Sequence, residues 1–232
     1  MCDDGLDAIA DRVRATLDEI DELREQGLVF SREIIRRSAT AIRLIHQRAF
    51  AEAEEAIRND AAELGAFREA LAAQPRIAHA PFISDAEKEH VEAWATLSLA
   101  TGRHLPTPEE LGSPPAAYLN GLAEGVSEIR RFVVDRIRAD EIAVAEAILA
   151  RMDEIYGVLV TFDYPDAVLE GLKRRLDTVR GVVEKTRHDL TMAVRQDRLV
   201  RAMADLERRT GIEQPDGSMP DDAVESDDGS GD

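Results

Sequence analysis

The sequence predicts an all-α fold of about six to seven long antiparallel helices. Apolar residues recur at steps of three and four along most of the chain, which is the spacing of one helix face. No segment alternates apolar and polar residues as a half-buried strand does, and proline and glycine collect in a few short stretches typical of loops. We expect one helical domain over residues 1–211.

The order of the elements follows from these repeats and from the residues that interrupt them. A first helix is expected over about 5–26 and is ended by Gly27, and Ser31 is suited to cap the N-terminus of a second helix. Further helices are expected over 48–73, over 85–101 after Ser84, over 116–138 and over 140–159, with a proline-rich loop over 102–115 and Pro165 at the start of the next helix.

The last long helix has the most regular pattern. Its apolar residues form a heptad seam, which indicates long helices packed nearly parallel, within the chain or between chains. The seam consists of Leu169, Leu172, Leu176, Val179, Val183, Thr186 and Leu190. The helix is expected to continue to about Arg209. Residues 212–232 form an acidic tail that we expect to be disordered, because it contains few apolar residues.

Composition excludes several classes of protein. Hydrophobic residues make up 44% of the 232 residues and charged residues 33%, as in a globular protein, and no apolar run reaches the roughly 18 to 20 residues of a membrane-spanning helix. The acidic N-terminus lacks the apolar core of a secretory signal, and the single cysteine, Cys2, has neither a partner nor a metal-binding spacing. We therefore expect a cytoplasmic protein with no membrane partner.

The net charge of −18 has two interpretations. Eight acids lie between Glu213 and Asp232, and the other 39 still outnumber the 29 bases, of which only Lys88, Lys173 and Lys185 are lysines. An acid-rich, lysine-poor surface is typical of adaptation to high salt, which screens repulsion between like charges. The alternative is an acidic surface that binds a basic partner. Salt adaptation is favoured, so local arginine clusters are more informative about ligands than the total charge.

Two pairs of glutamates form the most informative candidate site. Glu89 and Glu92 stand three residues apart, so they share one helix face. Glu124 and Glu128 stand four apart, opposite the apolar face of their helix. If the two helices meet, four carboxylates converge, and oxygen ligands of this kind bind Mg²⁺. The alternative is a solvated helix face, since about one residue in five is acidic.

Arginines form the second candidate set. Arg32, Arg36 and Arg43 share one side of a helix, and Arg131 follows the second glutamate pair. Arginine binds phosphate oxygens bidentately, which makes these side chains candidates for contacting nucleic acid. The alternative is that they pair with the abundant acids. The histidines have no zinc-binding spacing, and no glycine-rich phosphate loop occurs in the sequence.

Several segments, in order, resemble the translin family. They are 31–46 (SREIIRRSATAIRLIH), 89–93 (EHVEA), 118–131 (YLNGLAEGVSEIRR), 162–165 (FDYP) and part of the last helix over 177–190. Together they span roughly residues 28–190, and separate blocks in this order are far more specific than any single motif. The resemblance implies a translin-like helical bundle.

The family has a branch that binds nucleic acid, translin proper, and a catalytic branch similar to translin-associated factor X. In the catalytic branch, acids of the second and third blocks bind Mg²⁺ and cleave single-stranded RNA. This chain keeps an acid at all four positions, so it resembles the catalytic branch, in an archaeal type adapted to high salt. The resemblance assigns the catalytic and metal-binding roles, for Mg²⁺ or Mn²⁺, to Glu89, Glu92, Glu124 and Glu128.

The resemblance also bears on RNA binding and assembly. Arg131 stands where the family has an arginine that reaches the RNA backbone, and Arg32, Arg36 and Arg43 are further expected contacts. Glu124 replaces an aspartate of catalytic relatives, and Ala39 replaces a basic residue. The family's assembly implies a hollow homo-octamer with the acids facing its interior.

Three functions remain as hypotheses. The leading one is a Mg²⁺-dependent endoribonuclease acting on single-stranded RNA within an oligomeric barrel. The second is a non-catalytic ring that binds single-stranded RNA or DNA. The third is a structural helical scaffold in which arginines and glutamates only pair with each other.

Overall fold

The computed structural model describes residues 5–71 and 74–210, and it confirms the all-α fold. Within these ranges no strand occurs, and seven of the helices have at least eight residues. The helices are α1 (Leu6–His46), α2 (Phe50–Ile57), α3 (Asp60–Ala70), α4 (Pro75–Ala78), α5 (Pro81–Thr101), α6 (Pro115–Arg138), α7 (Ile142–Leu159), α8 (Asp166–Leu169) and α9 (Leu172–Thr210).

The chain divides into two compact units between Ala193 and Val194. The first unit contains α1 to α8 and most of α9, and the described part of the second consists of the last turns of α9, residues 194–210. The expected tail over 212–232 lies outside the described residues, so the expected division into a domain over 1–211 and a tail stays a prediction.

α1 runs without a break through Gly27, so the expected end of a helix there was wrong. A Cβ at Gly27 would lie 2.9 Å from Cε2 of Phe82 on α5, and this glycine therefore lets α1 pack closely against α5. Ser31 is 2% exposed in the middle of α1 and is not a cap. Glycine costs a helix only about 1 kcal/mol relative to alanine, which packing of a long helix easily offsets.

Other boundaries also differ from expectation. The segment 48–73 splits into α2 and α3. α5 begins at Pro81, where the missing N–H of proline leaves nothing unpaired, and Ser84 does not cap it. Instead, the Ser84 hydroxyl donates to Oε2 of Glu170 at 2.8 Å. Pro165 precedes α8 as its N-cap residue.

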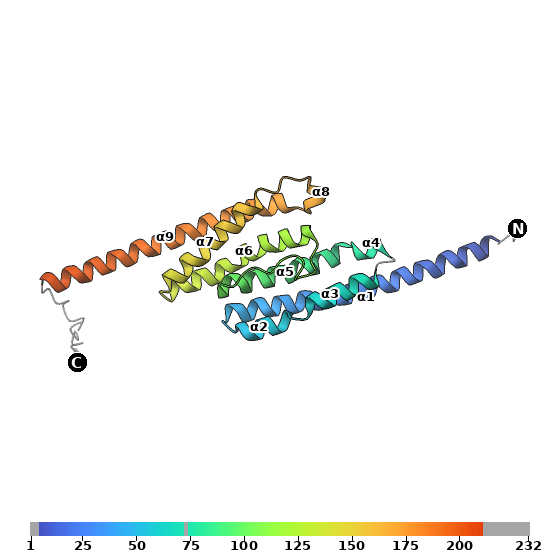
Figure 1. Ribbon diagram of the computed structural model, residues 1–232, viewed down its shortest axis with the longest axis horizontal. Helices are drawn as coiled ribbons and strands as arrows, with labels where there is room; N and C mark the ends of the chain where they lie inside the picture. Colours follow the sequence, from blue (N-terminus) through green and yellow to red (C-terminus); the bar gives the residue numbers. More distant parts are fainter. Residues whose placement is uncertain (1–4, 72–73, 211–232) are drawn as a thin grey trace, which may run out of the picture. The chain divides into compact units, whose positions relative to one another are not determined.

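α5 is the central helix of the first unit, because it packs against α1 and α2 and also against α6 (Figure 1). Small side chains on α5 allow these close contacts. One buried cluster combines α1, α2 and α5, and it consists of Ala41, Ile45, Ala53, Ile57, Ala93 and Leu97.

α5 and α6 approach closely because α6 presents two glycines to α5. A Cβ at Gly121 would lie 2.6 Å from Cβ of Val91 and 2.7 Å from the backbone oxygen of Lys88. A Cβ at Gly125 would lie 2.7 Å from Cβ of Ala95. Any larger side chain would push the two helices apart, because a close-packed interior has no room for it. The spacing of the helices that carry the glutamate pairs therefore depends on these glycines.

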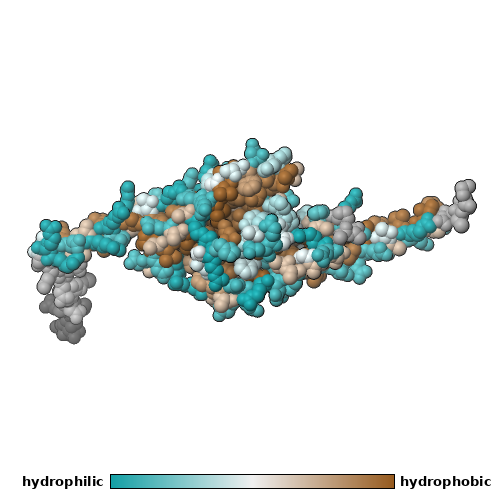
Figure 2. All heavy atoms as spheres, viewed as in Figure 1, coloured by the Kyte–Doolittle hydropathy of each residue, from teal (hydrophilic) through white to brown (hydrophobic). Residues whose placement is uncertain are grey.

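Some large apolar side chains remain exposed. On the N-terminal turns of α1 they are Leu6, Ile9, Val13 and Leu17, between 44% and 81% exposed, and Figure 2 shows apolar atoms along this arm. Within the second unit, Leu199, Val200, Met203 and Leu206 are between 53% and 60% exposed. In residues 5–71 and 74–210, no helix combines the length and the apolar composition needed to cross a membrane.

Candidate metal centre

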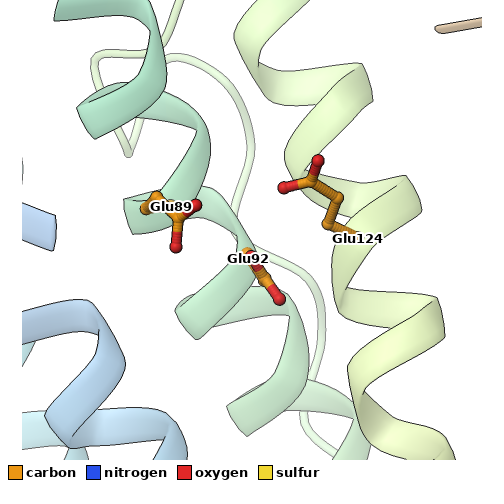
Figure 3. Close-up of side chains that lie close together, drawn as sticks. All are labelled: Glu89, Glu92 and Glu124. Atoms are coloured by element: carbon orange, nitrogen blue, oxygen red, sulfur yellow. The ribbon is translucent and has the colours of Figure 1, made fainter. Parts of the chain in front are cut away.

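Three carboxylates from two helices converge in the first unit. Glu89 and Glu92 come from α5 and Glu124 from α6, and one oxygen of each lies within 4.8 Å of the others (Figure 3). All three side chains are half-buried. The two halves of this cluster meet because Gly121 and Gly125 bring α6 onto the turns of α5 that carry the first pair.

Glu92 has the most unusual environment of the three. Burial, and then the charges of Glu89, Glu124 and Glu128, raise the pKa of its carboxyl to about 8. Its carboxylate makes no hydrogen bond or ion pair with any described residue. Burial also raises the pKa of Glu89, and the neighbouring Lys88 partly offsets that rise. A half-buried carboxylate among other acids is costly to ionise unless a cation joins it.

Two basic side chains contact Glu124, and sequence reasoning missed both contacts. Nε of Arg175 on α9 donates to Oε1 at 2.7 Å, and Nζ of Lys88 lies 3.2 Å from Oε2. Lys88 is adjacent to Glu89 in the sequence, a signal that could have drawn attention to it. Arg175 lies 51 residues from Glu124, and nothing in its local sequence indicates the contact.

Glu128, the fourth predicted ligand, lies beside the cluster but outside the group of three. Its Oε1 lies 2.6 Å from Nε2 of His46, the last residue of α1, whose side chain is 6% exposed. A pocket of about 370 Å³ opens here, and its lining includes Glu92, Glu124, Glu128 and Arg175. Glu128 therefore shares a pocket with two of the other carboxylates, and its role as a ligand stays a prediction.

The four predicted RNA-binding arginines are all exposed. Nη2 of Arg36 pairs with Glu33 at 2.6 Å, and Nη2 of Arg43 donates to the hydroxyl of Thr40 at 2.8 Å. Arg32 and Arg131 make no hydrogen bond or ion pair with the described part of the chain. The structure does not place these arginines in the pocket, and their contact with RNA stays a prediction.

Comparison with known proteins identifies relatives of this chain. No family model matches it. The uncharacterized protein MJ0175 of Methanocaldococcus jannaschii is 31% identical over 180 residues, which are 77% of this chain and 80% of that protein.

Solved structures are also similar. AfC3PO in a complex with duplex RNA is 34% identical, with a TM-score of 0.73 over 79% of this chain and 95% of that chain. AfC3PO in a second crystal structure is 33% identical, with a TM-score of 0.73 over 79% of this chain and 96% of that chain. The apo form of NeC3PO is 19% identical and has a TM-score of 0.71 over 79% of this chain and 96% of that chain, which shows a shared fold. From the identity and the coverage of AfC3PO together, this chain belongs to the C3PO and translin family.

Proposed function

We propose that this protein is a Mg²⁺-dependent endoribonuclease of the catalytic, translin-associated factor X-like branch. The observation that carries the proposal is the convergence of Glu89, Glu92 and Glu124, in which the Glu92 carboxylate makes no hydrogen bond or ion pair with any described residue. Membership of the family adds to it, since AfC3PO, a similar protein, was solved with duplex RNA.

The donor set fits a hard divalent cation. Carboxylate oxygens are the ligands of Mg²⁺ and Mn²⁺, and neither histidine nor cysteine belongs to the group of three, so a zinc site is disfavoured. Ionising all three carboxylates in a half-buried site is costly because like charges repel, and a divalent cation would relieve that repulsion. Glu89, Glu92 and Glu124 would hold the metal, with Glu128 as the expected fourth ligand.

The protein residues have distinct roles in this proposal. A bound divalent cation would supply an activated water and neutralise charge on the phosphate. Lys88 holds Glu124 in place in the absence of a metal, and His46 orients Glu128 through the contact at 2.6 Å. Arg131, Arg32, Arg36 and Arg43 would bind the RNA backbone outside the pocket.

The proposed substrate is single-stranded RNA, with single-stranded DNA as a weaker candidate. Because the AfC3PO complex contains duplex RNA, a duplex must be tested beside the single strand. The proposed setting is the cytoplasm of an organism adapted to high salt, since the chain carries a net charge of −18 and only three lysines.

The proposed assembly is a homo-octamer that encloses the carboxylates. Its support is the exposed apolar stripe on α1, from Leu6 to Leu17, because a contiguous apolar surface of this kind typically marks an interface. The half-exposed carboxylates suit the wet interior of such a barrel.

The second candidate function is a non-catalytic ring that binds single-stranded RNA or DNA, and the same experiment tests it. The observation in its favour is that Arg175 and Lys88 already neutralise Glu124, which reduces the need for a metal. The two proposals differ in whether RNA is cut or only retained.

The deciding experiment is cleavage of labelled single-stranded and duplex RNA by the purified protein at high salt, in Mg²⁺, Mn²⁺ or EDTA. We expect products that require the metal, a loss of at least about 100-fold in Glu89→Ala, and the same loss with retained RNA binding in Glu124→Gln plus Glu128→Gln. Glu146→Gln on the exposed surface of α7 is the matched control. RNA that stays intact yet bound under every condition would favour the binding ring.

A further inference from the structure

Arg175 shares the pocket with the carboxylates and is held there by several elements. Its Nε donates to Glu124, and its Nη1 donates to Oδ1 of Asn120 at 2.9 Å and to the backbone oxygen of Glu170 at 3.1 Å. A long flexible side chain loses little further freedom when it binds a ligand if its position is already set in this way.

The partners of Arg175 are themselves fixed. Asn120 is 2% exposed, and its amide nitrogen donates to the backbone oxygens of Ala116 and Leu169, each at 2.8 Å, so its oxygen must point toward Arg175. Glu170 has a φ of 50° and Gly171 a φ of 86°, so the turn between α8 and α9 is left-handed. A Cβ at Gly171 would lie 3.2 Å from Nη1 of Arg175, which makes glycine the residue that fits beside the guanidinium.

Nη2 of Arg175 is not used by these contacts. It makes no hydrogen bond with the described residues, and the side chain is 27% exposed and lines the pocket. Lys88 differs, because its Nζ lies between three acids, 3.2 Å from Glu124 and 3.8 Å from both Asp85 and Glu89. Arg175 therefore has N–H groups available to a ligand in the pocket.

We infer that Arg175 is a phosphate-binding residue of this site, whose Nη2 donates to a non-bridging oxygen of the RNA backbone held at the carboxylates. The inference rests on the proposed function. Its physical basis is charge: the carboxylates around the pocket repel a phosphate, and a guanidinium beside them offsets part of that repulsion. A guanidinium N–H also donates a strong, charge-assisted hydrogen bond to a phosphate oxygen.

The competing interpretation is that Arg175 only positions Glu124. The phosphate-binding role and the positioning role predict different effects of substituting Arg175. Loss of a phosphate contact weakens RNA binding and its dependence on salt, whereas loss of a positioning contact weakens binding of the metal.

The experiment compares the full-length protein with Arg175→Gln, Arg175→Lys and the control Arg174→Gln, whose exposed side chain has no partner among the described residues. Binding of fluorescein-labelled single-stranded RNA is followed by anisotropy in Ca²⁺ over a series of salt concentrations, with intact RNA verified on a gel. Single-turnover cleavage is then measured over a series of Mg²⁺ concentrations, and circular dichroism verifies folding.

We expect Arg175→Gln to weaken RNA binding by about 10- to 100-fold, as for a hydrogen bond to a charged group. The slope of log affinity against log salt should fall by about 0.7, the value for one phosphate contact in a single strand. Arg175→Lys should recover part of the affinity, and Arg174→Gln should bind RNA as the wild type does. The Mg²⁺ concentration that gives the half-maximal cleavage rate should not be higher for Arg175→Gln than for the wild type.

Two results would overturn the inference alone. One is unchanged RNA affinity and slope in Arg175→Gln, and the other is a rate that excess Mg²⁺ restores, which would make Arg175 a positioning residue for Glu124. A wild-type protein that neither cleaves nor binds RNA would overturn the proposed function and the inference together. A wild type that binds RNA without cutting overturns the nuclease only, and the affinity of Arg175→Gln then still decides the role of Arg175.

Discussion

Glu92 lies half-buried among three other acids, and this environment raises the pKa of its carboxyl to about 8. The same group titrates near 4.5 when it is free of that environment. Between these two pH values the folded protein holds a proton that the unfolded chain has lost. At neutral pH a metal must displace that proton, so metal affinity should increase as the pH rises toward 8.

Glu92→Gln tests this environment through stability. A raised pKa in the folded state means that the stability Glu92 contributes is complete below pH 4.5 and is lost as the pH rises to about 8. In EDTA we expect the variant to gain stability over the wild type across that range, by up to about 5 kcal/mol at pH 8. Thermal unfolding of both proteins as a function of pH gives the measurement.

Addition of Mg²⁺ is the control for that comparison. The metal should raise the Tm of the wild type more than that of Glu92→Gln, because binding to the folded state alone stabilises it. A difference in Tm that does not depend on pH in EDTA would show that Glu92 is not unusually protonated.

At the scale of elements, the close contact of α5 with α6 determines whether the carboxylates of the two helices meet. Gly121 and Gly125 leave room for α5, and Glu124 and Glu128 alternate with them along α6. Helical periodicity therefore places the glycines and the acids on adjoining faces. The distance between the helices determines whether the carboxylates from α5 and α6 can share one cation.

Gly121→Ala should separate the two helices. Its Cβ would lie 2.6 Å from that of Val91, so we expect a destabilisation of about 1 to 3 kcal/mol, as for an overpacked core. The rise in Tm on adding Mg²⁺ should shrink as well, because Glu124 moves away from Glu89 and Glu92.

Gly157→Ala is the matched control, since a Cβ at this helical position in α7 meets nothing within 4 Å. It should stabilise the protein by about 0.5 to 1 kcal/mol, which is the helix preference of alanine over glycine. Equal stability of the two variants in urea titrations would contradict the packing argument.

At the scale of the whole molecule, net charge and exposed apolar surface act together. The charge of −18 opposes assembly at low salt, whereas apolar side chains such as Leu6 and Val13, 81% and 53% exposed, favour it. Salt screens the charge repulsion without weakening the attraction between apolar side chains.

We expect Leu6→Glu plus Val13→Glu to lower the mass of the oligomer, because both charges enter the apolar stripe of α1. The measurement is size-exclusion chromatography with light scattering. Ala8→Glu plus Ala15→Glu adds the same charge at the same spacing on the opposite face of α1, and its mass should match that of the wild type. Loss of mass in both variants would indicate charge repulsion rather than an interface.

Salt should stabilise the protein. Between about 0.1 M and 2 M KCl we expect Tm to rise, because the Debye length falls from about 10 Å to under 3 Å. A chain that ends at Ile212 keeps 39 acids against 29 bases, so its Tm should depend less on salt. A Tm that does not change with salt would argue against salt adaptation.

Sequence reasoning found the helices whose pattern is local. α6 and α7 were predicted to within two residues, because their apolar repeats and flanking residues mark both ends. It was wrong at Gly27, since a glycine that ends a helix and a glycine that admits Phe82 look alike in a sequence.

Some features of the candidate site could be predicted from the sequence, and others could not. Glu89, Glu92 and Glu124 could be named from spacing and from the resemblance, because carboxylates at helical spacing are visible in the chain itself. The contacts of Arg175 with Glu124 and of His46 with Glu128 could not, since they join residues 51 and 82 positions apart.

The sequence by itself determined that the protein is all-α and which acids are candidates for a metal. Those properties follow from backbone periodicity and side-chain chemistry, which act within a few turns of one helix. Only the tertiary structure decided that three of the acids meet, that the Glu92 carboxylate makes no ion pair within the described residues, and that Arg175 borders their pocket. Those properties depend on how closely α5 packs on α6 and on where α9 places Arg175, and close approach between helices is set by packing that no single segment encodes.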